Sequence, residues 1–403
     1  MRTDQQPAPP FTVPPRRGGI GWGILLTALA WLACRMVVTA LWGPARAPFR
    51  FDPSMWARWD TFNYGAITQY GRNFGACDRP PFAGLPNPFH ATWCGTAGWL
   101  PGYPWLIRWL QTTGISLPDA GLMISWAAFA VALFLVWFGW GRELHPVRAL
   151  LFLIAFGSFP GAVYNFALFP TSLALAGVVG ALLAATRERF LLAAVLMTLA
   201  GLCYPSAWFA AGGLAVAMAL VGLSHGPRQA IRRGLWGLAG LASLVVLGVH
   251  DQIAFGHANA YLLVNTGPGL DTRGVPGTGF LQLVLHRNTA EQRRIGATAA
   301  DALALQGLLA VLLTSAATAR AAWAWLRSRA AGDVYPAAVG LAVVVGILAL
   351  SASGGAWNRS IVLAAPSVIC LRKLPLPLLV LLVGATVVTT AFVARAFFAG
   401  TLV

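Results

Sequence analysis

The fold is decided by an apolar run near the N-terminus, GIGWGILLTALAWLACRMVVTALWG, which occupies residues 19–43. Arg35 is the only charged residue in this run. A helix needs about 20 predominantly apolar residues to cross the hydrocarbon core of a bilayer. The run is long enough to span, so we expect it to remain as a membrane anchor behind a disordered, Pro-rich and basic tail at residues 1–18.

The composition of the whole chain indicates that lipid is its main solvent. Of the 403 residues, 58% are hydrophobic and 10% are charged, whereas soluble domains carry about 25% charged residues. The mean hydropathy is +0.68. A soluble fold could not bury this much apolar surface, which predicts a single membrane bundle with loops over residues 19–398.

Ten more apolar runs follow the first along the chain. We therefore predict an all-α polytopic membrane protein of about eleven transmembrane helices. The spans are expected at about residues 19–43, 120–141, 148–166, 168–186, 190–204, 206–224, 234–253, 302–326, 334–353, 357–371 and 375–397.

The segment at residues 99–115 decides the orientation of the bundle. It is apolar and aromatic, but it carries two prolines and a central Arg108. If it lies flat on the membrane as an amphipathic helix, every short basic turn falls on the side of the basic N-terminus, as the positive-inside rule requires. If it crosses, these turns face outward. We therefore expect a flat helix, a cytoplasmic N-terminus, and two long outer loops at residues 44–119 and 254–301.

The net charge of +16 does not indicate a nucleic-acid partner. All but one of the 28 basic residues are Arg, and most lie beside apolar runs, where they signal topology and contact anionic lipid.

Cys77 and Cys94 lie in one polar outer loop. An oxidising compartment would allow them to form a disulfide, but the sequence leaves open whether they are close enough to pair.

The first outer loop carries the residues best suited to chemistry. The stretch from Asp60 to Tyr70 has helical spacing, with Asp60 at its start, where the helix N-terminus stabilises a carboxylate. Two interpretations follow. Asp60 is a functional carboxylate at the membrane surface, or it is a helix N-cap and the aromatic residues near it form an interfacial belt.

Two motifs in this loop resemble those of a known family. The string RWDTFNYGAI at residues 58–67, followed by Tyr70-Gly71, is similar to the first-loop signature of the PIG-V-like mannosyltransferases. Asn63 replaces the His or aromatic residue that is usual there, and the family's last pair is reversed. The string WLPGYPWLIR at residues 99–108 is similar to a second family segment, which reads Phe-Phe-Pro-Leu-Tyr-Pro-Leu-Leu-Ile-Arg.

Later segments depart further from the family pattern. Tyr164 and the PTS string at residues 170–172 resemble a segment that normally contains a Glu, which is absent here. The string WNRS at residues 357–360 occupies the place of a Ser-Arg-Tyr motif. The resemblance follows the chain in order, but only the first two motifs are specific.

The resemblance implies a GT-C-type helical bundle and an inverting glycosyltransferase of the bacterial plasma membrane. Such enzymes take a sugar, usually mannose, from a polyprenyl-phosphate carrier and transfer it to a lipid or glycan acceptor on the outer face. It implies Asp60 as the general base, with Asp52 as the alternative base or as a second carboxylate that orients the sugar. No metal or other cofactor is expected, because Arg side chains can neutralise the leaving phosphate.

Six residues are candidates for binding the donor. Three are arginines that could neutralise the phosphate, with Arg359 first among them, and three are aromatic residues that could stack on sugar faces. They are Arg359, Arg58, Arg108, Trp59, Tyr64 and Tyr103. Each also has an ordinary interpretation, because arginines at span ends snorkel to the membrane surface and aromatic belts have the same composition.

Three other functions compete with this one. A GT-C enzyme could use another sugar donor. A lipid flippase or solute transporter would need ionisable residues in the middle of the bundle, where the sequence offers only Arg35 and Arg320, both near span ends. A non-catalytic subunit that scaffolds another enzyme would tolerate the loss of Asp60, whereas an enzyme would not.

Overall fold

The computed structural model describes residues 19–40, 52–58, 60–84, 91–265, 297–328, 331–350 and 357–400. Within these ranges the chain is almost wholly helical, with one antiparallel pair of short strands, β1 (Gly75–Ala76) and β2 (Trp93–Cys94). The predicted N-terminal tail and residues 266–296 of the second outer loop lie outside the described residues.

Six helices in the described ranges are long and apolar enough to cross a membrane. They are α1 (Ile20–Thr39), α5 (Leu117–Val136) with its π-helical continuation η3 (Trp137–Gly141), α9 (Ser206–Leu223), α15 (Ala297–Ser328), α16 (Val334–Leu350) and α18 (Leu376–Phe398). A seventh span results if α10 (Pro227–Ala239) and α11 (Ala242–Phe255), which are bent by 41°, are counted as one. The chain is therefore an all-helical integral membrane protein.

Four of the eleven predicted spans contain helices too short to cross alone. They are α6 (Pro146–Gly157), α7 (Thr171–Thr186), α8 (Phe190–Cys203) and the 3₁₀ helix η6 (Ile361–Leu371). The longest, α7, has 16 residues and rises about 24 Å, less than the roughly 30 Å of bilayer hydrocarbon. Within the described ranges, helix length therefore supports six or seven full spans, and the predicted number of eleven is not confirmed.

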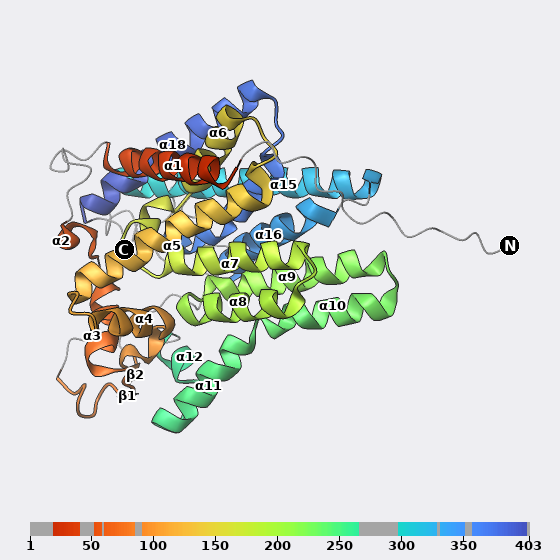
Figure 1. Ribbon diagram of the computed structural model, residues 1–403. Coiled ribbons are helices and arrows are strands. Elements are labelled where there is room, and N and C mark those ends of the chain that lie inside the picture. Colours follow the sequence, from red (N-terminus) through yellow and green to blue (C-terminus); the bar gives the residue numbers. More distant parts are fainter. Residues whose placement is uncertain are drawn as a thin grey trace.

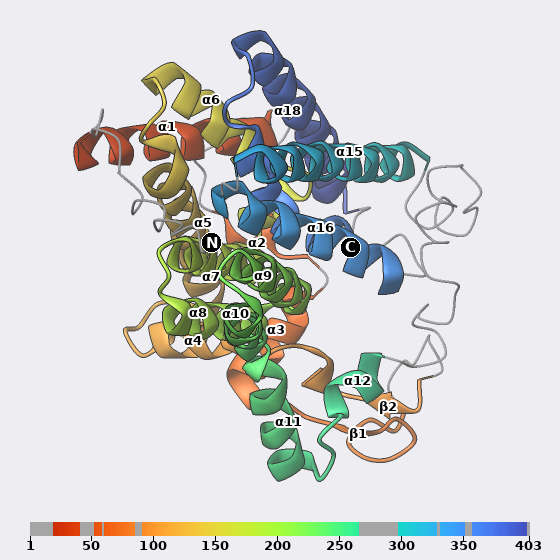
Figure 2. The same cartoon turned by 90° about the vertical axis from the view of Figure 1, so that its right-hand side faces the viewer.

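The bundle has a core and a flank. Figure 1 shows α7, α8 and α9 running side by side, and Figure 2 views them nearly along their axes. Helices α15 and α16 run obliquely to them and are seen from the side in Figure 2. Every residue of η6 is buried, and η6 packs mainly against α15 and α16. Helices α1, α6 and α18 pack against one another on one flank. The short elements α2 (Pro53–Trp56), α3 (Thr61–Tyr70), α4 (Gly102–Gln111) and α12 (Ala260–Asn265) gather with the strands toward the left of Figure 1.

Between α6 and α7 the chain is buried from Ser158 to Pro170 and irregular apart from one 3₁₀ turn, η4 (Ala162–Asn165). Non-helical backbone at membrane depth is tolerated only where protein satisfies its polar groups. Thr390 of α18 donates to the Ser158 carbonyl at 2.8 Å, and the Gly161 N–H donates to Gln306 Oε1 of α15 at 3.1 Å. Helices on both sides therefore hold this segment in place.

The basic turns lie together at the end of the bundle away from α3, to the right of Figure 1. Arg142 and Arg187, from two different turns, both place their guanidinium groups over the ring of Phe138, at 5.1 and 4.6 Å. Arg148 donates to the carbonyl of Leu374 at 3.0 Å. These contacts join the turns that precede α6, α8 and α18.

Two ion pairs extend this cluster of basic turns. Arg233 of α10 pairs with Glu188 at 2.9 Å, and Arg372 pairs with Asp333 at 2.5 Å. The short turns that were predicted to share one face of the membrane are thus neighbours in space.

Helix α4 occupies the segment at 99–115 and is too short to cross, because its ten residues span only about 15 Å. It has two faces. Tyr103 and Ile107 are buried, whereas Trp105 and Trp109 are 47% and 66% exposed. The helix therefore has the form of an interfacial helix, with aromatic side chains on its outer face. Gly102 lets its first turn approach α8, since a Cβ there would lie 2.8 Å from the Leu202 carbonyl oxygen.

Candidate functional site

The segment that carries Asp60 is fixed to the irregular stretch between α6 and α7. The Leu168 N–H donates to the Trp56 carbonyl at 3.1 Å, and the Thr61 hydroxyl donates to the Leu168 carbonyl at 3.2 Å. The Thr61 hydroxyl also accepts from the Arg58 N–H at 3.1 Å. Asp60, which immediately precedes α3, is therefore held on a rigid support.

The structure decides against a capping role for the Asp60 side chain. Asp60 has the N-cap position of α3, but its carboxylate accepts no hydrogen bond from the helix N-terminus. Its Oδ2 forms an ion pair with Nη1 of Arg359 instead. The two side chains are 14% and 17% exposed, although Nη1 of Arg359, the atom that faces Asp60, is itself buried.

Arg359 comes from α17 (Trp357–Ser360), the turn before the buried helix η6. Its guanidinium carbon lies 5.8 Å from the centre of the Phe169 ring, at the end of the irregular segment. Next to it in the chain, the Ser360 hydroxyl is 3.2 Å from the hydroxyl of Tyr204. The site thus combines one carboxylate, one guanidinium and two hydroxyl groups from three separate parts of the chain, with the Phe169 ring from a fourth.

Tyr64 borders the ion pair from one turn further along α3. It is 3% exposed, and its ring meets those of Tyr103 and Phe169 edge-on at 5.8 and 5.9 Å. Burial raises the pKa of the Tyr64 hydroxyl well above its usual value, and the nearby charge of Asp60 raises it further. Tyr64 therefore remains a neutral hydrogen-bond donor beside Asp60.

Asp52 caps a helix N-terminus, which is the structural role that the sequence also allowed for Asp60. It is the N-cap of α2, and its Oδ1 accepts from the Ser54 N–H at 3.1 Å and from the Ser54 hydroxyl at 2.6 Å. A cap of this kind contributes about 1 kcal/mol to helix stability. Its carboxylate is thus engaged locally at the start of the segment that leads to Asp60.

The other predicted donor-binding residues are not brought to the ion pair. Arg58 binds the C-terminal end of α18, where its guanidinium donates to the carbonyl groups of Phe397 and Phe398 at 3.4 Å. Tyr103 is fully buried, and its hydroxyl donates to the Gly121 carbonyl at 2.8 Å. It has no surface to offer a sugar, which corrects the expectation that it stacks on one.

Two predicted donor-binding residues remain, Arg108 and Trp59, and only Arg108 lies within the described residues. Arg108 is exposed on α4, where it faces away from the buried side that holds Tyr103 and Ile107. Trp59 lies outside the described residues. Of the eight residues predicted for catalysis or donor binding, the structure therefore brings Asp60, Arg359 and Tyr64 together.

A second charged cluster, which the sequence did not reveal, joins the first long loop to α11. Arg72, just after α3, forms an ion pair with Asp251 of α11, and its Nη2 donates to the second carboxylate oxygen at 3.2 Å. The two side chains are 2% and 0% exposed. His250 Nδ1 lies 3.1 Å from Arg72 Nη1 and 3.0 Å from Asp251 Oδ1. This is a fully desolvated pair, with His250 at its exposed edge.

The outer loops form a small cap around this cluster. Cys77 and Cys94 are joined by a disulfide, with their Cα atoms 5.0 Å apart, next to the paired strands β1 and β2. Phe74 and Trp93 stack at 4.8 Å between ring centres. Asn265 of α12 donates to the Gly98 carbonyl at 3.0 Å and ties the second loop to the first.

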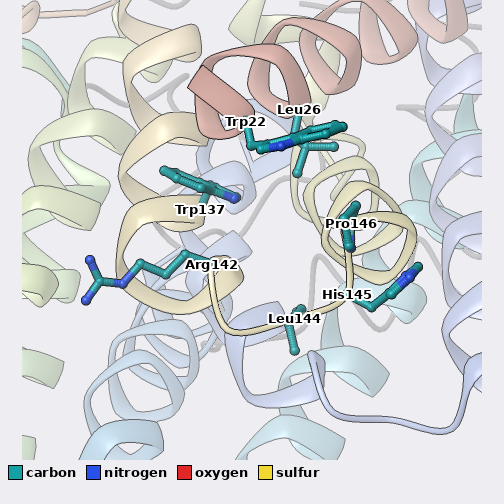
Figure 3. Close-up of a pocket in the computed structure, with 7 residues that line it drawn as sticks. All are labelled: Trp22, Leu26, Trp137, Arg142, Leu144, His145 and Pro146. Carbon is teal, nitrogen blue, oxygen red and sulfur yellow. The ribbon is translucent and has the colours of Figure 1, made fainter. Parts of the chain in front are cut away.

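A cavity of about 240 Å³ lies at the other end of the bundle, among the basic turns. Figure 3 shows Trp22 and Leu26 of α1 on one side of it and Trp137 on the other. The guanidinium of Arg142 points away from these side chains, toward the Phe138 ring. No carboxylate is among the lining residues, so this cavity does not compete with Asp60 as a site for acid–base chemistry.

The described part of the chain contains no group of three His, Cys, Asp or Glu side chains that could hold a metal ion. At the candidate site, the charged groups that could act on a substrate are Asp60 and Arg359. The sequence matches no known family model, and no curated protein is similar enough to it to count as a match.

Proposed function

We propose that this protein is an inverting glycosyltransferase of GT-C type, which takes its sugar from a polyprenyl-phosphate carrier. The observation that supports this most directly is the ion pair of Asp60 and Arg359, partly exposed and bordered by the hydroxyl group of Tyr204. A base and a phosphate ligand are the two charged groups that transfer from a sugar phosphodiester requires.

The reaction assigns one task to each member of the pair. Asp60 accepts the proton of an acceptor hydroxyl while the oxygen of that hydroxyl attacks the anomeric carbon of the donor sugar. The bond between that carbon and the phosphate oxygen breaks, and the electron pair leaves with the polyprenyl phosphate. Arg359 stabilises the charge that develops on the leaving phosphate. Because attack comes from the face opposite the phosphate, the anomeric configuration inverts.

The donor sugar proposed is mannose, on the resemblance of residues 58–67 and 99–108 to the PIG-V-like mannosyltransferases. The acceptor proposed is a hydroxyl group of a lipid or glycan on the outer face of a bacterial plasma membrane. A polyprenyl chain stays in the lipid while its phosphate reaches the membrane surface. The exposed tryptophans of α4 suit that boundary, since their amphipathic rings favour the interface.

The proposed activity is tested with the purified full-length protein in lipid nanodiscs. Radiolabelled mannose should pass from a polyprenyl-phosphate donor to an acceptor in an extract of membrane lipids and glycans. No transfer is expected from a nucleotide-linked mannose, because that donor lacks the lipid chain. Absence of transfer from polyprenyl-phosphate mannose, with transfer from another polyprenyl-phosphate sugar, would keep the reaction type and replace mannose as the donor. Absence of transfer from every lipid-linked sugar would overturn the proposal.

The orientation proposed places the basic turns in the cytoplasm and Asp60 on the outer face. Thr113 follows α4 and Ser328 ends α15, and both are exposed. We expect Thr113→Cys to react in intact cells with a membrane-impermeant maleimide, and Ser328→Cys to react only after the membrane is opened. The native Cys34, Cys203 and Cys370 are buried, which keeps the background low. The reverse labelling pattern would place the proposed site on the cytoplasmic side.

A further inference from the structure

We propose that Asp60 and a phosphate group compete for Arg359, so that the ion pair seen here is the closed state of an anion-binding site. The identification of the anion as a lipid-linked phosphate rests on the proposed function. The competition itself rests on the geometry of the pair. Its consequence is that binding of the donor releases the carboxylate that the acceptor needs.

The first argument is that the pair is both anchored and reachable. Arg359 lies two residues before η6, all of whose residues are buried, and Asp60 precedes Thr61, which is bonded to the irregular segment. Neither backbone can follow its side chain far. Nη1 of Arg359, which faces Asp60, is itself buried, so an anion must approach through the part of the Arg359 side chain, 17% of it, that is exposed.

The second argument concerns donors and acceptors. A guanidinium carries five N–H donors in a planar fork, and a phosphate can take two of them at once. The pairing with Asp60 joins one nitrogen to one carboxylate oxygen. The Tyr204 hydroxyl hydrogen-bonds the Arg359 side chain and lies 3.2 Å from the Ser360 hydroxyl, so Tyr204 offers a phosphate a further donor beside the guanidinium. A phosphate would therefore find more partners here than the carboxylate does.

The third argument is electrostatic. A sugar phosphodiester carries one negative charge, and it becomes a phosphate monoester of higher charge when the sugar leaves. Arg359 therefore interacts more strongly with the product phosphate than with the donor, which favours the transfer step. Meanwhile a carboxylate oxygen that no longer contacts a guanidinium is free to accept the proton of the acceptor hydroxyl. The donor must accordingly bind before the acceptor can be activated.

The test measures binding of farnesyl phosphate to the full-length protein in nanodiscs, with no sugar transfer involved. Asp60→Asn removes the competing charge and should tighten binding about threefold to tenfold, the range expected for a partly exposed ion pair. Arg359→Gln should abolish the binding. Asp78→Asn is the matched control, because Asp78 is an exposed carboxylate of the same outer loop, and it should leave the affinity within about twofold of wild type.

Two further ligands distinguish the contribution of the lipid chain from that of the phosphate group: farnesol carries only the chain, and inorganic phosphate carries only the phosphate. Farnesol should bind weakly and equally to wild type and Asp60→Asn, whereas inorganic phosphate should compete with farnesyl phosphate only at high concentration. Equal affinity of wild type and Asp60→Asn for farnesyl phosphate would overturn the proposal. So would unchanged binding by Arg359→Gln, in a preparation whose thermal unfolding shows that it is folded.

These outcomes are independent of the proposed enzyme activity. If Asp60→Asn binds farnesyl phosphate more tightly but the wild-type protein transfers no lipid-linked sugar, the anion site stands and the glycosyltransferase assignment fails. If the wild type transfers sugar but Asp60→Asn gains no affinity, the activity stands and the competition for Arg359 does not occur.

Discussion

Asp60→Asn should lower sugar transfer by a factor of about 10² to 10⁴ while the protein remains folded, since this is the usual contribution of a general base. Asparagine has nearly the same shape as aspartate but cannot accept the acceptor's proton. The Asp60 side chain makes no cap hydrogen bond to α3, so the substitution removes no support from that helix. The measurement is the initial rate of label transfer from a polyprenyl-phosphate donor, with expression and thermal unfolding recorded in parallel.

Asp78→Asn again serves as the control for the loss of one outer carboxylate and should keep the wild-type rate. A glutamate at position 60 is also informative, because it restores the carboxylate about one bond further from the backbone. Asp60→Glu should recover part of the rate lost in Asp60→Asn. Transfer at the wild-type rate by Asp60→Asn would exclude Asp60 as the base.

Asp251→Asn should destabilise the protein by about 3–5 kcal/mol, because it leaves a buried charge without its partner. Arg72 and Asp251 are 2% and 0% exposed, so water cannot replace the lost carboxylate. We expect a large drop in the thermal unfolding temperature and faster proteolysis of the outer loops. The double variant Arg72→Met/Asp251→Leu should recover much of the loss, since it removes both buried charges.

The ion pair at the other end of the bundle provides the comparison. Glu188 is 65% exposed, whereas its partner Arg233 is 9% exposed and also lies 5.3 Å from the centre of the Phe190 ring. Because only one member of this pair is buried, Glu188→Gln should cost clearly less than Asp251→Asn. Equal shifts for Asp251→Asn and Glu188→Gln would show that the Arg72–Asp251 pair is not desolvated as described. A large shift confined to Asp251→Asn would establish that the buried pair stabilises the contact between the first long loop and α11.

The hydropathy of the sequence predicted where the helices lie more accurately than it predicted how many of them are long enough to span a membrane. Each of the eleven predicted segments contains a helix, but those of α6, α7, α8 and η6 are short. Burial inside a protein and exposure to lipid select the same apolar residues, so composition cannot distinguish them. The fully buried stretch from Ser158 to Pro170 has the composition of a span, although only the structure shows its irregular backbone.

The candidate site could be predicted only one residue at a time. Asp60 was expected from its position at a helix start, and Arg359 from its position at a span end. Their ion pair depends on how α3 and α17 meet, which no spacing in the sequence records. Arg72 and Asp251 are separated by 179 residues, and neither stands in a motif that marks it as the partner of the other.

The irregular segment between α6 and α7 also has a consequence for biosynthesis. The Ser158 carbonyl is satisfied by Thr390 and the Gly161 N–H by Gln306, and both partners are translated more than a hundred residues later. Until α15 and α18 have left the ribosome, this part of the nascent chain cannot settle in lipid with its polar groups paired. Its insertion must therefore wait for the C-terminal helices, and truncation before α18 should leave the N-terminal half prone to degradation.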